Sequence, residues 1–169
     1  MNLYILRHGQ TNYNFEGRFQ GRVDTVLNDV GIKQVEETAV ELRKINFDVV
    51  ISSPLTRAIQ TAEKVTSQEI QTDERIIERS FGLLEGKHSV PDYEENYEKY
   101  EIEPMESLIK RVNEFINEIK EKYCEKQNVL VVAHEAVAQV VEAYFNGLPA
   151  SNNIKEYRLG NAKYKVFKV

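Results

Sequence analysis

The chain has 169 residues and a net charge of -5, and 41% of its residues are hydrophobic while 29% are charged. This length suits a single domain over residues 1–169 that buries a core without help from a metal or a disulfide. The 27 acidic against 22 basic side chains argue against a nucleic-acid partner and against an anionic membrane surface. A local basic pocket that takes a small anion is still compatible with this charge.

The cysteine and hydropathy patterns favour the cytoplasm. The single cysteine, Cys124, lies in a helical pattern, cannot form an internal disulfide, and is expected to be a packing or surface thiol. No stretch approaches the roughly 18 consecutive apolar residues of a membrane-spanning helix. Met1 is followed by a strand-like run instead of a secretory signal, so we expect a cytoplasmic protein.

The first half of the chain alternates between buried strands and helices. Short, continuous apolar runs predict strands that are covered on both faces, and apolar residues at helical spacing predict the helices. Asn28 is expected to be the cap of the first helix, and Ser53-Pro54 predicts the start of the second, with Arg57 about one turn inside it. The predicted strands cover 2–6, 48–52 and 70–72, the helices cover about 28–44 and 53–65, and 7–27 and 76–86 are expected to be loops.

The second half continues the alternation after an acidic stretch. Between Pro91 and Pro104, three tyrosines at spacings of four and three predict a small lid or side helix with a packed tyrosine face. The tail predicts a hairpin of antiparallel edge strands around Gly160-Asn161. The remaining predicted elements are a helix over about 108–123, a strand over 128–133 that ends at His134, and a helix over 136–144 closed by Asn146-Gly147.

This order of elements predicts a three-layer α/β sandwich. The central sheet is expected to be mainly parallel, with helices on both faces and an antiparallel C-terminal edge. In such sheets, ligands bind outside the carboxyl ends of the strands. Three predicted strands place Arg7-His8, Arg57 and His134 at that edge. Each alone is typical of an ordinary polar loop, but their shared location predicts a common site.

Two arginines and two histidines suit a phosphomonoester, whose dianion needs compensating charge in the transition state. One histidine must be neutral to attack phosphorus, and nearby arginine charges would lower its pKa toward that state. The other would best be protonated, so that it donates to a phosphoryl oxygen. The departing alcohol needs an acid with a raised pKa, for which Glu78 is the candidate.

Five segments resemble the histidine phosphatase superfamily, also called phosphoglycerate mutase-like, and within it the bacterial phosphatase branch. They span nearly the whole chain in the family's order, and the first and third are highly specific. The segments are LRHGQT at 6–11, RFQGRVDTVLNDVGIKQ at 18–34, SSPLTRAIQTAE at 52–63, ERSFGLLEG at 78–86 and VLVVAH at 129–134.

The resemblance implies that His8 forms a phosphohistidine, which water then hydrolyses, while Glu78 donates and then accepts the proton. It implies that the phosphoryl group is bound by Arg7, Asn14, Arg57 and His134, with Gln20-Gly21 bordering the pocket. No metal or other cofactor is implied. His88 matches no catalytic position and is expected to lie on the surface.

Two departures from the family pattern stand out. The family usually has glycine after the second histidine, where this chain has Glu135; the expectation is that its side chain points away from the pocket, and that it would repel a dianion and raise the pKa of His134 if it pointed inward. The segment 85–106 is short and holds eight acidic residues against Lys87 and Lys99, without the basic insertion of phosphoglycerate mutases. We expect it to act as a lid that disfavours polyanionic substrates.

The resulting hypothesis is a phosphatase that acts on a small phosphorylated metabolite. A phosphoglycerate-type mutase would share every catalytic residue, and a non-catalytic phosphate-binding regulatory module would need a lesion such as Glu135. The motifs leave the alcohol open among sugar phosphates, phosphoserine and α-ribazole phosphate. They also leave the oligomeric state open.

Overall fold

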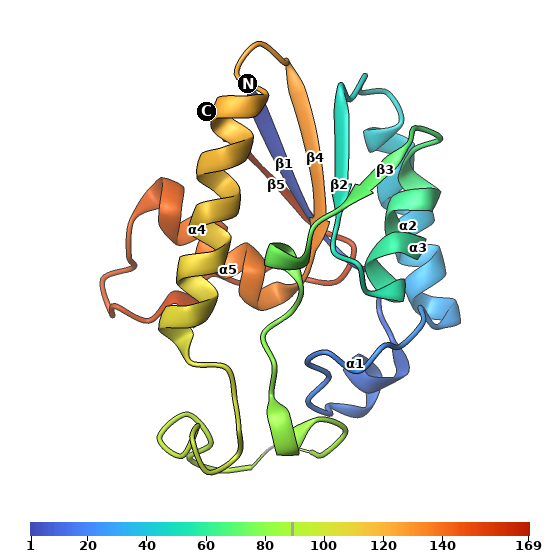
Figure 1. The fold of residues 1–169 in the computed structure, drawn as a ribbon. Coiled ribbons are helices and arrows are strands. Elements are labelled where there is room, and N and C mark those ends of the chain that lie inside the picture. Colours follow the sequence, from blue (N-terminus) through green and yellow to red (C-terminus); the bar gives the residue numbers. More distant parts are fainter. Residues whose placement is uncertain (89) are drawn as a thin grey trace.

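A computed structural model describes residues 1–88 and 90–169 and is built on a five-stranded sheet in the order β3-β2-β4-β1-β5. The first four strands are parallel to their neighbours, and β5 runs antiparallel to β1. This confirms the predicted mainly parallel sheet with an antiparallel C-terminal edge (Figure 1). The strands are β1 (Asn2–Arg7), β2 (Val49–Ser52), β3 (Ile70–Thr72), β4 (Asn128–Ala133) and β5 (Tyr164–Lys168).

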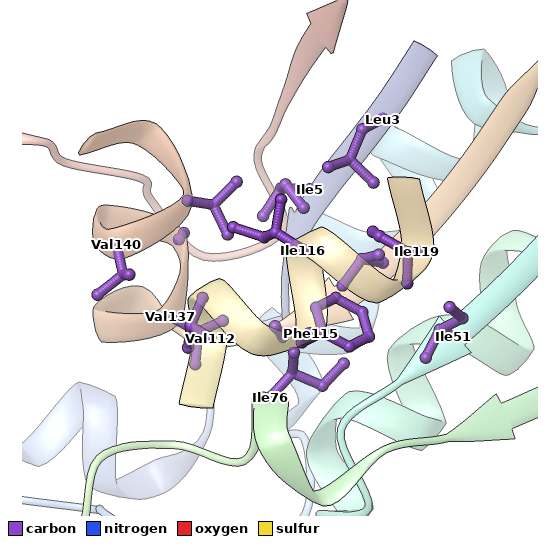
Figure 2. Close-up of a cluster of buried hydrophobic side chains, with 14 of the residues drawn as sticks. Leu3, Ile5, Ile51, Ile76, Val112, Phe115, Ile116, Ile119, Val137 and Val140 are labelled. Carbon is purple, nitrogen blue, oxygen red and sulfur yellow. The ribbon is translucent and has the colours of Figure 1, made fainter. Parts of the chain in front are cut away.

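Helices cover both faces of the sheet, which confirms the three layers. On one face lie α2 (Asp29–Leu42) and α3 (Thr56–Val65), and on the other lie α4 (Met105–Lys122) and α5 (Glu135–Asn146) (Figure 1). The alternation of a strand divides its side chains between the layers, so Ile5 packs in one cluster and Leu6 in the other. Figure 2 shows the first cluster, in which Phe115 and Ile116 of α4 pack toward the sheet residues.

The predicted loop over 7–27 contains a short helix, α1 (Asn12–Glu16). Thr11 caps this helix by accepting from the backbone N–H of Asn14, and the Asn14 side chain accepts from the backbone N–H of Thr11. No residue of α1 is buried, so the helix has no apolar stripe that the sequence could reveal. In Figure 1, α1 lies beyond the carboxyl ends of the strands.

The helix predicted over 53–65 is α3, and it begins later than predicted. Its first residue is Thr56, and Arg57 is its second residue. Asp24, in the loop between α1 and α2, caps the helix. Its Oδ1 accepts from the backbone N–H of Thr56 at 2.7 Å, and its Oδ2 accepts from the Thr56 hydroxyl at 2.7 Å. The predicted cap, Ser53, instead lies with its hydroxyl 2.7 Å from His134 Nε2.

Two other predictions about local structure were wrong. Residues 91–101 form successive turns instead of a side helix, and Asp92 and Glu101 adopt left-handed backbone angles that interrupt a regular helix. The tail contains one strand, β5, and no hairpin, since Leu159 and Gly160 lie in irregular chain. Short 3-10 helices cover Glu74–Ile76, Gly82–Leu84 and Ile154–Glu156.

Cys124 and His88 are exposed, as predicted. Among the residues that the structure describes, no helix is long and apolar enough to span a membrane.

Candidate active site

A pocket of about 270 Å³ lies at the carboxyl edge of the sheet and brings together residues from distant parts of the sequence. Seven of the eight predicted site residues line it; the eighth, His134, lies behind His8, with 5.1 Å between the centroids of the two rings. The seven are Arg7, His8, Asn14, Gln20, Gly21, Arg57 and Glu78.

His8 follows β1 directly, and its side chain is 2% exposed. Its Nδ1 lies 2.7 Å from the carbonyl oxygen of Gly9, which can only accept a hydrogen bond. Nδ1 is therefore assigned the proton, and the lone pair lies on Nε2. Burial, followed by the charges of Arg57 and Arg7, holds the pKa of His8 well below its ordinary value of 6.5. The imidazole is neutral at physiological pH and suited to nucleophilic attack.

The guanidinium of Arg57 is buried and held in a fixed position beside His8. It donates from Nη1 to the carbonyl oxygen of Val23 at 2.9 Å and from Nη2 to that of Gly21 at 2.7 Å, while Nε lies 3.3 Å from His8 Nε2. Burial lowers the pKa of Arg57 to about 10, so it remains a cation at neutral pH. Its position early in α3 therefore places a fixed positive charge next to the nucleophilic nitrogen.

Arg7 ends β1 and is held by the C-terminal part of the chain. Its Nη1 donates to the carbonyl oxygen of Leu159 at 2.8 Å and lies 3.1 Å from Oε2 of Glu135. Its Nε is buried and has no hydrogen-bond partner among the described residues. This buried donor is available to an anion in the pocket. Glu135 thus lines the pocket, which contradicts the expectation that its side chain points away.

His134 is fully buried, and its protonation differs from the prediction. Its Nε2 lies 2.7 Å from the hydroxyl of Ser53, and its Nδ1 has no partner among the described residues. Burial, followed by the charges of Arg57, His8 and Arg7, holds its pKa well below 6.5 instead of keeping it protonated. With the Ser53 hydroxyl donating to Nε2, Nδ1 carries the proton, and a neutral His134 can still donate a hydrogen bond.

Glu78 carries the carboxyl group that the sequence assigns to proton transfer. Its side chain is 9% exposed, and Oε1 accepts from the backbone N–H of Arg79 at 2.9 Å. Burial raises the pKa of Glu78 above its ordinary value, although Arg57 and Arg7 oppose that shift. A raised pKa is what a proton donor needs near neutral pH.

The predicted polar border of the pocket lies beside these groups. Asn14 Oδ1 accepts from Asn161 Nδ2 at 3.2 Å, which ties α1 to the tail. The amide of Gln20, oriented to donate to the Thr11 hydroxyl, accepts from Arg57 Nη1 at 3.1 Å. Gly21 adopts a φ of 51°, a backbone conformation that favours glycine, and a Cβ there would lie 2.1 Å from Oε1 of Glu85.

The comparison with known families decides the identity of this site. Residues 3–169 match the model of the histidine phosphatase superfamily (branch 1). The chain belongs to this superfamily. The resemblance seen in the sequence is thereby confirmed.

Relatives of this histidine phosphatase carry several different names. A protein of Hydrogenobacter thermophilus proposed to be a phosphoserine phosphatase is 34% identical over 166 residues, which cover 89% of this chain and 81% of the relative. The adenosylcobalamin/α-ribazole phosphatase of Escherichia coli K12 is 31% identical with the same coverage. An E. coli O139:H28 protein proposed to be a phosphoglycerate mutase is 30% identical over 166 residues, covering 89% and 77%.

A solved structure of the Shigella flexneri α-ribazole phosphatase has a TM-score of 0.87 and 28% identity to this chain; the match covers all of this chain and 91% of that one. The predicted activity class, a phosphatase, agrees with these relatives.

Sequence reasoning missed the outer half of the pocket of this histidine phosphatase. Phe19, Phe81 and Tyr93 form an aromatic wall, with Phe19 4.8 Å from Phe81 and 4.9 Å from Tyr93 between ring centroids. The many acidic residues of 91–104 predicted an effect of charge, but the residues of that segment that line the pocket are Tyr93 and Glu94. The tyrosine pattern was the signal available in the sequence.

The pocket is basic although the protein is acidic. Six cationic side chains line it against three carboxyl groups, and the cations are Arg7, Arg18, Arg57, Arg79, Lys155 and Arg158. Such a cluster favours anionic ligands through the local potential. Within the described residues there is no group of three or more His, Cys, Asp and Glu side chains that could hold a metal ion.

Proposed function

We propose that the protein is a phosphomonoesterase that hydrolyses a small phosphorylated metabolite through a phosphohistidine on His8. The observation that carries this proposal is the buried His8 imidazole, whose Nδ1 is fixed by Gly9 and whose Nε2 lies 3.3 Å from Arg57 Nε. This arrangement presents a neutral nucleophile beside the charge that an incoming phosphoryl group requires. Two further buried nitrogens, Arg7 Nε and His134 Nδ1, have no partner among the described residues and suit phosphoryl oxygens.

The reaction proceeds in two displacements. The Nε2 lone pair of His8 forms a bond to phosphorus, and the bond from phosphorus to the alcohol oxygen breaks with its electrons on oxygen. Glu78 gives its proton to that oxygen and becomes a carboxylate. Water then attacks phosphorus while Glu78 takes a proton from it, which releases phosphate and regenerates His8 and protonated Glu78. No step uses a metal, so we expect activity to persist in EDTA.

The segment 85–106 is proposed to cover the pocket within the same single domain. Glu94 from this segment accepts from Arg79 Nη1 at 2.8 Å and Nη2 at 3.0 Å, and it lies 2.5 Å from Lys155 Nζ. These contacts join the segment to the tail of the chain across the pocket rim. The exposed, unpaired thiol of Cys124 suits a reducing compartment, so we propose a cytoplasmic metabolite as substrate.

A mutase is the second candidate, because a relative proposed to be a phosphoglycerate mutase is 30% identical over 166 residues. A mutase must hold a doubly phosphorylated ligand and keep water from the phosphohistidine. The described residues of segment 85–106 that line the pocket are Tyr93, Glu94 and Met105, so this segment supplies no cation for a second phosphoryl group. Arg79 and Lys155 line the pocket from elsewhere and pair with Glu94. Phosphoglycerate isomerisation with and without a bisphosphorylated primer separates the two activities.

The direct test is a hydrolysis screen over phosphorylated metabolites with His8→Ala and His88→Ala as paired variants. Loss of the nucleophile is expected to reduce kcat by at least about 10⁴-fold. His88→Ala is the matched control, because His88 is exposed and lies outside the pocket lining. Enzyme denatured during turnover and kept at alkaline pH, where the P–N bond of phosphohistidine is stable, is expected to carry a phosphoryl group in the wild type and none in His8→Ala. Turnover retained by His8→Ala would contradict the covalent mechanism.

A further inference from the structure

The carboxylate of Glu135 lines the same pocket as His8 and the proposed proton donor Glu78. Glu135 is the first residue of α5, its side chain is 28% exposed, and it lines the pocket. The backbone of the next residue, Ala136, lies near enough to the carboxyl group of Glu78 to favour its ionised form, against the larger effect of burial. Glu135 therefore flanks the proposed proton donor, which must lie against the departing alcohol oxygen.

The other two carboxyl groups of the pocket are compensated. Glu94 forms a two-pronged pair with Arg79, whose side chain is 3% exposed, and also pairs with Lys155. These contacts hold the pKa of Glu94 at about 2 and offset its charge. Burial instead raises the pKa of Glu78, which favours its neutral form. Neither group presents a free negative charge to a substrate. The acidic segment 85–106 therefore does not repel anions in the way that the sequence suggested.

The pairs that Glu135 forms compensate it weakly when a phosphoryl group is bound. Its nearer partner is Arg7, at 3.1 Å, and the positive charge of that arginine is largely offset once a phosphoryl dianion binds beside it. Its other partner is Arg158, at 3.5 Å, and the side chain of Arg158 is 79% exposed, so this pair contributes little. A second anionic group on the alcohol would then meet a carboxylate on the pocket wall.

We propose that Glu135 is a specificity-determining residue that, within a pocket that is basic overall, disfavours phosphomonoesters whose alcohol carries a second anionic group. This inference rests on the proposed phosphatase function. The effect is electrostatic, so a carboxylate on the alcohol weakens transition-state binding and an ammonium group on the alcohol strengthens it. Glu135 also restrains Arg7, and that effect is the same for every phosphomonoester.

The test compares kcat/KM for three small esters that differ in charge: phosphoglycolate, propyl phosphate and O-phosphoethanolamine. In Glu135→Gln, the ratio of phosphoglycolate to propyl phosphate is expected to rise about tenfold, and the ratio of O-phosphoethanolamine to propyl phosphate to fall by about as much. Glu135→Asp retains the charge and is expected to keep the wild-type ratios. Glu156→Gln is the matched control, since Glu156 is exposed and lies outside the pocket lining.

Changes of less than about twofold in both ratios for Glu135→Gln would overturn the inference. Equal changes in Glu156→Gln would also overturn it, because the effect would then belong to net charge. Failure of the wild type to hydrolyse any ester would contradict the proposed function instead. The same ratios are therefore also measured as dissociation constants of the three esters in a His8→Ala background, where binding selectivity is read without turnover. Thermal unfolding of each variant checks that it folds.

Discussion

The proposed role of Glu78 as proton donor predicts how the enzyme depends on its leaving group. If Glu78 protonates the departing oxygen, Glu78→Gln is expected to reduce kcat/KM for an alkyl phosphate by about 10²- to 10⁴-fold. The same substitution should have little effect on kcat/KM for p-nitrophenyl phosphate, because nitrophenolate leaves without a proton and kcat/KM does not include the later hydrolysis of the phosphohistidine. Hydrolysis of both esters by the variant and the wild type measures this difference.

The buried environment of Glu78 predicts where activity falls at high pH. The raised pKa of this carboxyl group moves the loss of its proton, and with it the alkaline fall of kcat/KM, above the ordinary glutamate range. Glu95→Gln is the control, since Glu95 is an exposed acid outside the pocket lining.

For the leaving-group prediction, equal losses of kcat/KM for the alkyl and the p-nitrophenyl ester in Glu78→Gln would show that Glu78 does not act as the proton donor.

Single residues differ in how far the sequence could reveal them. Arg7, His8 and Arg57 follow predicted strands, so the sheet topology alone places them at one edge, and the structure brings them together. The direction of Glu135 was not predictable, because it depends on Arg7 and on Arg158, which lies in an irregular tail. The lowered pKa of His134 likewise depends on complete burial, which no local pattern shows.

At the level of elements, α4 positions the segment that carries Glu78. Arg111 of α4 donates from Nη1 to the carbonyl oxygens of Arg75 and Ile77, both at 2.6 Å, and from Nη2 to that of Glu78 at 3.2 Å. Its Nε donates to Glu103 Oε1 at 2.7 Å. The side chain of Arg111 thus holds the irregular segment around Glu78 in place, where the chain forms no backbone hydrogen bonds to a neighbouring strand.

Arg111→Met is expected to lower kcat by at least about tenfold with a smaller change in KM, because Glu78 would lose its fixed position while the phosphate-binding groups stay in place. The alkaline limb of the pH profile should move to lower pH as Glu78 gains water and its pKa falls. Lys110→Met, an exposed neighbour on the same helix, is the control. An unchanged pH profile with reduced thermal stability would assign Arg111 a purely structural role.

The elements that escaped prediction share a physical cause. Apolar periodicity identified α2, α4 and the strands, because the spacing of their buried residues along the sequence matches the repeat of a helix or a strand. In contrast, α1 depends on capping, the start of α3 depends on Asp24 from a distant loop, and residues 91–101 depend on contacts with Phe19 and Phe81. Such long-range contacts leave no periodic signal.

At the scale of the whole molecule, the two buried histidines couple folding to pH. The folded-state pKa values of His8 and His134 lie below 6.5, so the unfolded chain binds protons that the folded protein rejects. As pH falls below about 6.5, each histidine is expected to remove up to about 1.4 kcal/mol of stability per pH unit. Glu78 opposes this loss, because its raised pKa retains a proton in the folded state that the unfolded chain releases above its ordinary pKa.

Urea unfolding at pH 7, 6 and 5 tests this balance. The net loss from pH 6.5 to 5 is expected to be smaller than that of two histidines, because Glu78 offsets part of it. His134→Asn should reduce this loss, whereas His88→Asn should leave it unchanged because His88 is exposed. A stability that does not fall in this range, in the wild type and also in Glu78→Gln where the opposing carboxyl group is absent, would mean that His8 and His134 accept protons in the folded protein. A protonated His8 has no lone pair on Nε2 for phosphorus, so the same result would also contradict its proposed role as a nucleophile that is ready at neutral pH and below.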